Sequence, residues 1–171
     1  MSTEAEVKEL IQDFVLITYD IPAKAATLRN KFLKAAKAIG AEQHTDSVYL
    51  IPYSTEAMAL AAELESAGHA IIWQAHQPDQ KKALEIMTKY EGSLKTRCNF
   101  IEQRLVIAQE YIQAGRLGVA QIMGIKTGKL LQQLAHIAEN FKPPWLLPKI
   151  EELVTKWKGI YEDGEQSKNP E

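Results

Sequence analysis

The period of the apolar pattern changes near Pro78, and this change constrains the fold more than any other feature of the sequence. Before Pro78, short β-rich apolar runs alternate with segments whose apolar residues recur at helical spacing. After Pro78, only the helical period remains. The chain has 171 residues, enough for one ordinary domain or two small ones. We therefore predict an α+β fold, with one module over residues 1–78, an all-helical region over 79–161 and a disordered tail over 162–171.

The first module contains three strand signals and two helix signals. The strands are predicted over residues 14–18, 47–53 and 69–74, and the helices over residues 23–39 and 55–67. Gly40 follows the first helix, where a left-handed C-cap is expected. Thr55 is the predicted N-cap of the second helix. Trp73, in the third strand, is interpreted as a core residue.

The second half reads as helices only. Asp79 is expected to cap a long helix over about residues 80–114, which ends at Gly115. Spacings of four and three mark a coiled-coil-like seam along it. The seam consists of Leu94, Cys98, Ile101, Leu105, Ala108 and Ile112. Two shorter helices are predicted over residues 117–123 and 127–140, and Pro148 is expected in the first turn of a last helix.

Several short segments resemble a known family. Tyr19-Asp20-Ile21 closes the first strand, a Lys/Arg-rich helix follows over Thr27 to Ala41, and Asp46 to Leu50 (DSVYL) enters the second strand. These segments resemble the ferredoxin-like module of the small CRISPR spacer-acquisition nucleases. They are closer still to the N-terminal domain of the chromate resistance protein B family. The resemblance covers about residues 12–77.

The chromate resistance family pairs a "GVYLLP"-type second strand with a small-residue helix and a strand containing Trp. The matching segments are Ser47 to Pro52, Glu56 to Gly68 and Ala70 to Ala75. The resemblance implies a β-α-β-β-α-β module, so a fourth strand must come from residues 42–54. It also implies a regulatory rather than an enzymatic role, with residues 79–161 as the counterpart of the family's helical segment.

A basic helix is the first candidate site. Its region is free of acidic residues from Ile21 to Ala41. The basic side chains in this region are Lys24, Arg29, Lys31, Lys34 and Lys37. Steps of three place Lys31, Lys34 and Lys37 in one exposed stripe, which can contact phosphates independently of base sequence. The alternative is a solvated face whose lysine stems cover apolar surface.

Residues 116–134 suggest a helix-turn-helix. Ala120 allows two helices to approach, and Gly124 lies in the expected turn. The nucleic-acid contacts would come from Lys126, Thr127 and Lys129. The alternative is a corner of a helical bundle that turns at a glycine.

Asp20 is the candidate metal ligand. A carboxylate at the end of a strand can bind Mg²⁺ or Mn²⁺, and two copies of Asp20 in a dimer could share one ion that activates water. In the CRISPR nucleases, the aspartate that matches Asp20 binds the metal. The alternative is that Asp20 caps the turn before the first helix.

We expect a non-enzymatic regulatory or nucleic-acid-associated protein, with DNA or RNA as its partner, no cofactor and a homodimeric assembly. One alternative is a metal-dependent nuclease with Asp20 at a dimer interface. Another is an assembly protein that binds partners through its long helix. The single cysteine, the polar N-terminus and the lack of an apolar run of about 20 residues predict a cytoplasmic protein without a membrane span.

Overall fold

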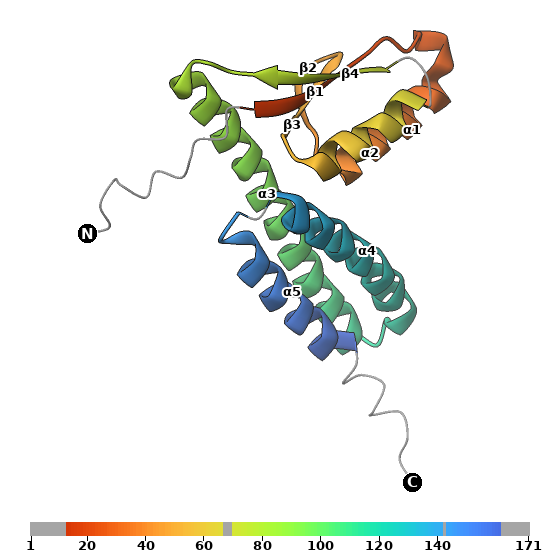
Figure 1. Ribbon diagram of the computed structural model, residues 1–171. Coiled ribbons are helices and arrows are strands. Elements are labelled where there is room, and N and C mark those ends of the chain that lie inside the picture. The colour runs from red at the N-terminus through yellow and green to blue at the C-terminus, as the bar shows by residue number, and fades with distance from the viewer. Residues whose placement is uncertain (1–12, 67–69, 142, 162–171) are drawn as a thin grey trace, which may run out of the picture. The chain divides into compact units, whose positions relative to one another are not determined.

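The computed structural model describes residues 13–66, 70–141 and 143–161 (Figure 1). The predicted tail over 162–171 lies outside the described residues. The chain divides into two compact units, Met1–Ser93 and Leu94–Glu171. Each unit is described by itself below.

The first unit is a four-stranded antiparallel sheet with helices. Its elements are β1 Asp13–Tyr19, the 3₁₀ turn η2 Ala23–Ala25, α1 Ala26–Ala38, β2 Glu42–Thr45, β3 Val48–Pro52, α2 Thr55–Ser66 and β4 Ala70–His76. The strand order is β2-β3-β1-β4. This β-α-β-β-α-β arrangement confirms the predicted ferredoxin-like module. The fourth strand is β2, which comes from the segment 42–54 as expected.

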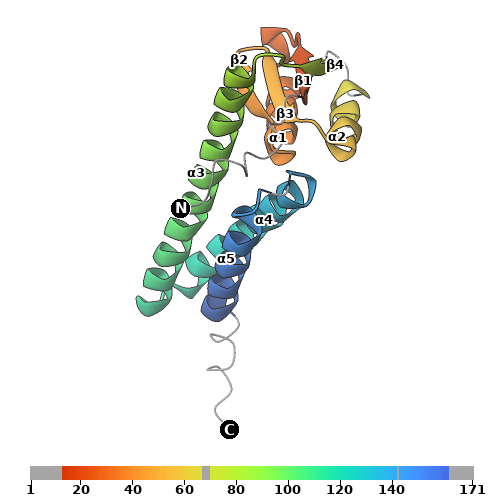
Figure 2. The same cartoon turned by 60° about the vertical axis from the view of Figure 1, so that its left-hand side comes forward.

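The two faces of the sheet are covered differently. Val15, Ile17 and Tyr49 share one face and are buried. Phe32 of α1 packs on this face, with its ring centroid 4.6 Å from that of Tyr19. Helix α2 also contacts β4 and β1. The opposite face holds Phe14 and its same-face neighbours on β1 and β3. In Figure 2, α2 and the first turns of α3 lie on opposite sides of the sheet.

Helix α3, Gln80–Gln113, supplies the cover for part of this second face. Ala83, Ile86 and Met87 pack with Phe14, Leu16 and Leu50. The compact first unit therefore extends to Ser93, beyond the boundary near Pro78 that the change of period indicated. The change of period marks where secondary structure changes, whereas the extent of the unit depends on what buries the sheet.

Two of the three predicted caps in the first unit are confirmed. Gly40 ends α1 with φ of 84°, the left-handed conformation that glycine adopts without steric cost. The Asp79 carboxylate accepts hydrogen bonds from the N–H groups of Lys81 (2.9 Å) and Lys82 (3.2 Å). The cap at Thr55 is wrong. Ser54 caps α2 instead, because its Oγ accepts the Ala57 N–H at 2.9 Å.

The second unit contains three helices: the remainder of α3, α4 Leu117–Phe141 and α5 Leu146–Tyr161. Gly115, with φ of 72°, ends α3. The seam predicted along α3 is confirmed, because its residues from Leu94 to Ala108 are buried and Ile112 is half-buried. Among the described residues, none of the helices combines the length and the apolar character needed to cross a membrane.

The helix-turn-helix prediction is wrong. Residues Leu117–Phe141 form one helix of 25 residues, and Gly124 lies inside it. The glycine is needed for close packing, because a Cβ on Gly124 would lie 2.6 Å from the Tyr161 ring of α5. The Tyr161 hydroxyl donates to the Ala120 carbonyl at 3.1 Å, and Trp157 Nε1 donates to the Gly124 carbonyl at 3.1 Å. The small residues therefore form a surface that receives two aromatic rings.

Candidate functional site

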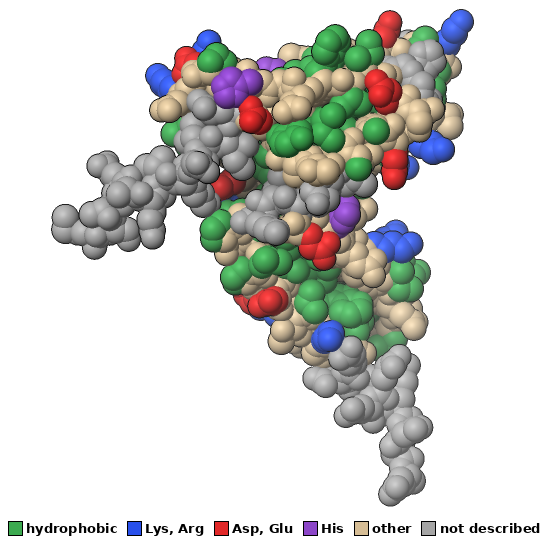
Figure 3. Space-filling model, in the orientation of Figure 1, with side chains coloured by type: hydrophobic (Ala, Val, Ile, Leu, Met, Phe, Trp, Pro, Cys, Tyr) green, Lys and Arg blue, Asp and Glu red, His purple; other side chains and the backbone are tan. Residues whose placement is uncertain are grey.

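Three lysines form a stripe on the outer face of α1. Lys31, Lys34 and Lys37 are all exposed, whereas Phe32 and Ala36 are buried on the inner face. Figure 3 shows Lys and Arg side chains projecting from the side of the first unit where α1 lies. The segment from Ile21 to Ala41 contains no carboxylate. The structure therefore brings together the predicted phosphate-binding lysines, which we call the lysine stripe.

Arg29 is exposed but does not belong to the lysine stripe. It precedes Lys31 by two residues, which is about 200° around the helix. Its charge acts on Tyr49, a buried residue of β3. Burial raises the pKa of Tyr49, and the positive charge of Arg29 opposes that rise. Arg29 thus lies near the buried aromatic cluster of the sheet rather than beside the three lysines.

The three candidate residues on α4 have different surroundings. Lys126 and Lys129 are exposed, but Thr127 has no exposed surface. The Thr127 hydroxyl donates to the Met123 carbonyl at 2.8 Å and accepts from Arg104 Nε at 3.2 Å. Its hydrogen-bonding capacity is used within the second unit. The arrangement gives Thr127 a packing role that its position beside two lysines did not reveal.

Asp20 lies directly after β1 and is exposed. Within the described ranges, there is no group of three or more His, Cys, Asp or Glu side chains that could hold a metal ion. Among its described residues, one chain therefore does not place Asp20 in a cluster of three such ligands. A site shared between two copies stays a prediction.

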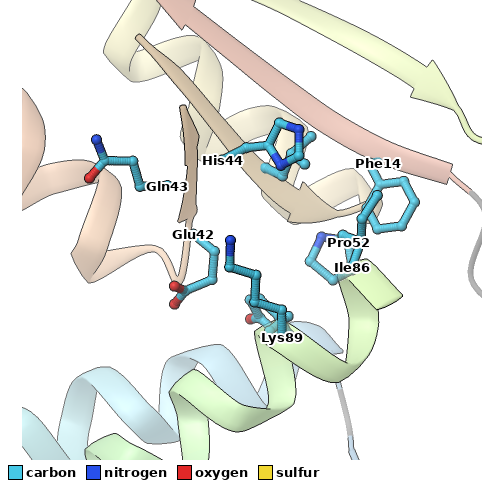
Figure 4. A pocket seen from close by; sticks show the side chains of 9 residues that line it. Phe14, Glu42, Gln43, His44, Pro52, Ile86 and Lys89 are labelled. Carbon is cyan, nitrogen blue, oxygen red and sulfur yellow. The ribbon is translucent and has the colours of Figure 1, made fainter. Parts of the chain in front are cut away.

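A small pocket lies between the β2–β3 side of the sheet and the start of α3 (Figure 4). Phe14 and Ile86 contribute apolar walls, and Glu42, His44 and Lys89 are polar residues that line it. Glu42 accepts a hydrogen bond from Ser93 Oγ at 2.5 Å. The pocket volume of about 30 Å³ suits a single water molecule rather than a substrate.

A larger groove lies in the second unit between α3 and α5. Its volume is about 660 Å³, and its apolar lining includes Leu105, Val106 and Ile160. At the rim, Glu102 accepts a hydrogen bond from Lys156 at 2.9 Å. A groove of this kind can receive an apolar helix face. It is the feature of the second unit that fits the assembly alternative.

The sequence reading missed an apolar surface on β4. Ile71 and Trp73 are 53% and 51% exposed, although Trp73 was interpreted as a core residue. Both lie on the sheet face opposite α1 and α2. Trp73 Nε1 donates to Thr18 Oγ1 at 3.2 Å, which holds the indole on the sheet and leaves much of its ring exposed. The alternation of side chains along β4 places Ile71 and Trp73 on one face of the sheet. The sequence does not show which face the helices cover.

The resemblance to the chromate resistance protein B family stays a prediction. Comparisons with protein-family models, curated proteins and solved structures found no match for this chain.

Proposed function

We propose that this protein is a non-enzymatic protein that binds the phosphate backbone of nucleic acid through the lysine stripe of α1. The observation that carries the proposal is that Lys31, Lys34 and Lys37 are exposed together on a helix without carboxylates. Each ammonium group can contact a phosphate as a compact charge with three donors. Contacts of this kind are independent of base sequence.

The dimensions of the lysine stripe suit a short stretch of backbone. Six residues separate Lys31 from Lys37, which is about 9 Å along a helix. The long, flexible lysine side chains extend this reach, so the stripe can contact about three phosphates. Release of the corresponding counterions gives a slope of about −2.7 for log K against log salt on duplex DNA.

The regulatory part of the proposal rests on the resemblance of residues 12–77 to the chromate resistance family. A regulatory module needs no catalytic residues, and the lysine stripe supplies binding without base specificity. Specificity would then come from another surface or from a partner.

The test is a titration of labelled duplex DNA and single-stranded RNA followed by fluorescence anisotropy at several salt concentrations. The variant replaces Lys31, Lys34 and Lys37 with alanine. The matched control replaces Lys81, Lys82 and Lys89, three exposed lysines of α3, so that both variants lose the same charge. We expect the stripe variant to raise Kd about tenfold or more at low salt and to flatten the salt slope. Equal weakening in both variants, or no binding by the natural chain, contradicts the proposal.

The same samples test the nuclease alternative. They are incubated with Mg²⁺ or Mn²⁺ and analysed on a gel. Cleavage that is lost in Asp20→Ala supports a metal-dependent nuclease, whereas binding without cleavage supports the non-enzymatic function.

A further inference from the structure

The two edges of the sheet differ. At one edge, β2 is a four-residue polar strand, and its pairing with β3 shifts between Gln43 and Thr45. Short, polar and irregular strands are the means by which proteins prevent edge-to-edge pairing. At the other edge, β4 pairs with β1 over seven consecutive residues without a shift. Its sequence AIIWQAH contains no Lys and no Pro. Among the described strands, only the β2 edge therefore carries these protective features.

The unprotected edge also has backbone groups directed outward. The Ile72 N–H contacts Glu65 Oε1 of α2 at 3.4 Å, so this N–H points away from β1. In an antiparallel edge strand, every second residue directs its backbone N–H and C=O away from the neighbouring strand. The backbone groups of Ala70, Gln74 and His76 therefore have the same orientation as those of Ile72. A length of 3.4 Å makes the Glu65 contact a weak one. A paired strand can therefore replace it.

We propose that β4 pairs antiparallel with β4 of a second copy of this chain, forming a continuous eight-stranded sheet. An antiparallel strand is complementary to itself about a two-fold axis, since both copies present the same donors and acceptors. A register with Trp73 opposite Trp73 of the partner subunit pairs all seven residues. It also places the exposed apolar side chains of both copies on one face, where cross-strand pairs stabilise a sheet.

The charges around β4 favour a second copy as the occupant. From Ala70 to Gln74 the strand has no ionisable side chain, so self-pairing brings no like charges of the strand itself together. The carboxylate beside this edge is that of Glu65 on α2. The ionisable residue His76 lies at the end of β4 and contacts Asp13 Oδ1 at 2.6 Å. Antiparallel pairing puts the two His76–Asp13 pairs at opposite ends of the interface. A strand that met a charged partner peptide would be expected to display complementary charges.

This dimer is compatible with the proposed function and does not depend on it. The lysine stripe lies on a helix that covers the opposite face of the sheet from Trp73, so pairing through β4 leaves it exposed. The dimer does not create the shared Asp20 site. Tyr19, next to Asp20, pairs with Ala70 at the start of β4. Antiparallel pairing separates the two starts of β4, so the two Asp20 carboxylates lie at opposite ends.

The experiment is sedimentation velocity of the full chain over a range of concentrations. We expect a dimer of twice the 19.2 kDa chain mass. Trp73→Lys and Ile71→Lys each place a charge on the edge and should raise the dimer dissociation constant about tenfold or more. The matched control is Ile125→Lys, because Ile125 is 59% exposed on α4 of the second unit. This control should leave the dimer unchanged.

A third variant tests the edge in the opposite direction. Glu65→Ala removes the side chain that contacts the Ile72 N–H and should lower the dimer dissociation constant. Circular dichroism checks that each variant is folded. The proposal is overturned if the natural chain stays monomeric at the highest concentration. It is also overturned if both β4 variants stay dimeric, or if Ile125→Lys alone dissociates the dimer.

Discussion

Helices α1 and α4 both carry lysines that the sequence assigned to nucleic-acid binding, but their surroundings differ. On α1, the three lysines share an exposed face with no carboxylate on the helix. On α4, Thr127 is buried between the two exposed lysines, and Gly124 is used to pack α5. Lysines in a segment therefore do not by themselves indicate a binding site. The packing of the small residues between them must also be known. Small residues in α4 serve helix packing, and those residues made the segment look like a turn.

The largest expected effect concerns Gly124. Gly124→Leu places a side chain where a Cβ alone would lie 2.6 Å from the Tyr161 ring. Overpacking of this kind is expected to lower the free energy of unfolding by about 2–3 kcal/mol. The measurement is urea unfolding followed by circular dichroism. Gly118→Leu is the control, since a Cβ on Gly118 meets no atom within 4 Å. Equal stability of the two variants would mean that α5 does not pack closely on Gly124.

A smaller effect is expected at Thr127. Thr127→Val keeps the shape of the side chain but removes the acceptor of Arg104 Nε, at a cost of about 1–2 kcal/mol in unfolding free energy. Thr155→Val is the control, because the exposed Thr155 hydroxyl donates to the Glu151 carbonyl of its own helix. Chemical unfolding of both variants measures the difference. If Thr127 instead contacted nucleic acid, Thr127→Val would weaken nucleic-acid binding and leave the unfolding free energy unchanged.

Sequence reasoning succeeded where the signal is local and failed where the reason for a residue lies far away in the chain. Local signals were sufficient for the left-handed end of α1 at Gly40, the cap at Asp79 and the buried seam of α3. Gly124 was misread because the reason for it lies in Tyr161, 37 positions further along the chain. Its local signal is the same in a turn and in a close helix contact.

The candidate sites divide in the same way. The exposure of the lysine stripe follows from helical spacing, so the sequence predicted it. The exposure of Trp73 depends on which face of the sheet α1, α2 and α3 cover. That choice is made by tertiary packing, and strand alternation alone gives two equivalent faces.

A cluster of ion pairs in the second unit offers a further comparison with the lysine stripe. In the second unit, Lys149 and Lys156 contact both Glu102 and Glu152, at distances from 2.7 to 3.5 Å. Hydrogen bonds from Lys156 lower the pKa of both carboxyls, with Lys149 adding to the effect. Hydrogen bonds to Glu152 and Glu102 raise the pKa of both lysines. These four residues form an ion-pair cluster between α3 and α5.

The sign of the pH dependence follows from these shifts. Because the carboxyl pKa values are lowered on folding, their contribution is present above about pH 4.3 and is lost as the pH falls through the folded values. Because the lysine pKa values are raised, their contribution is present below about pH 10.4 and is lost as the pH rises further. Exposure and salt screening keep the effect small. Glu152→Gln should reduce the loss of stability below pH 4.3 in low salt, and Glu151→Gln should not. Equal acid sensitivity in both variants would contradict the cluster.

The smallest stability effect is expected on α1. Replacing Lys31, Lys34 and Lys37 with alanine should change the unfolding free energy by less than about 0.5 kcal/mol, because exposed side chains contribute little and alanine favours a helix. The measurement is the same urea unfolding used for Gly124→Leu. A clear loss of stability would mean that the lysine stems cover apolar surface, which is the alternative interpretation of this helix. Unchanged stability with weakened nucleic-acid binding would separate function from folding at these positions. In α4, by contrast, changes at Gly124 and Thr127 affect folding first, because both residues take part in packing within the second unit.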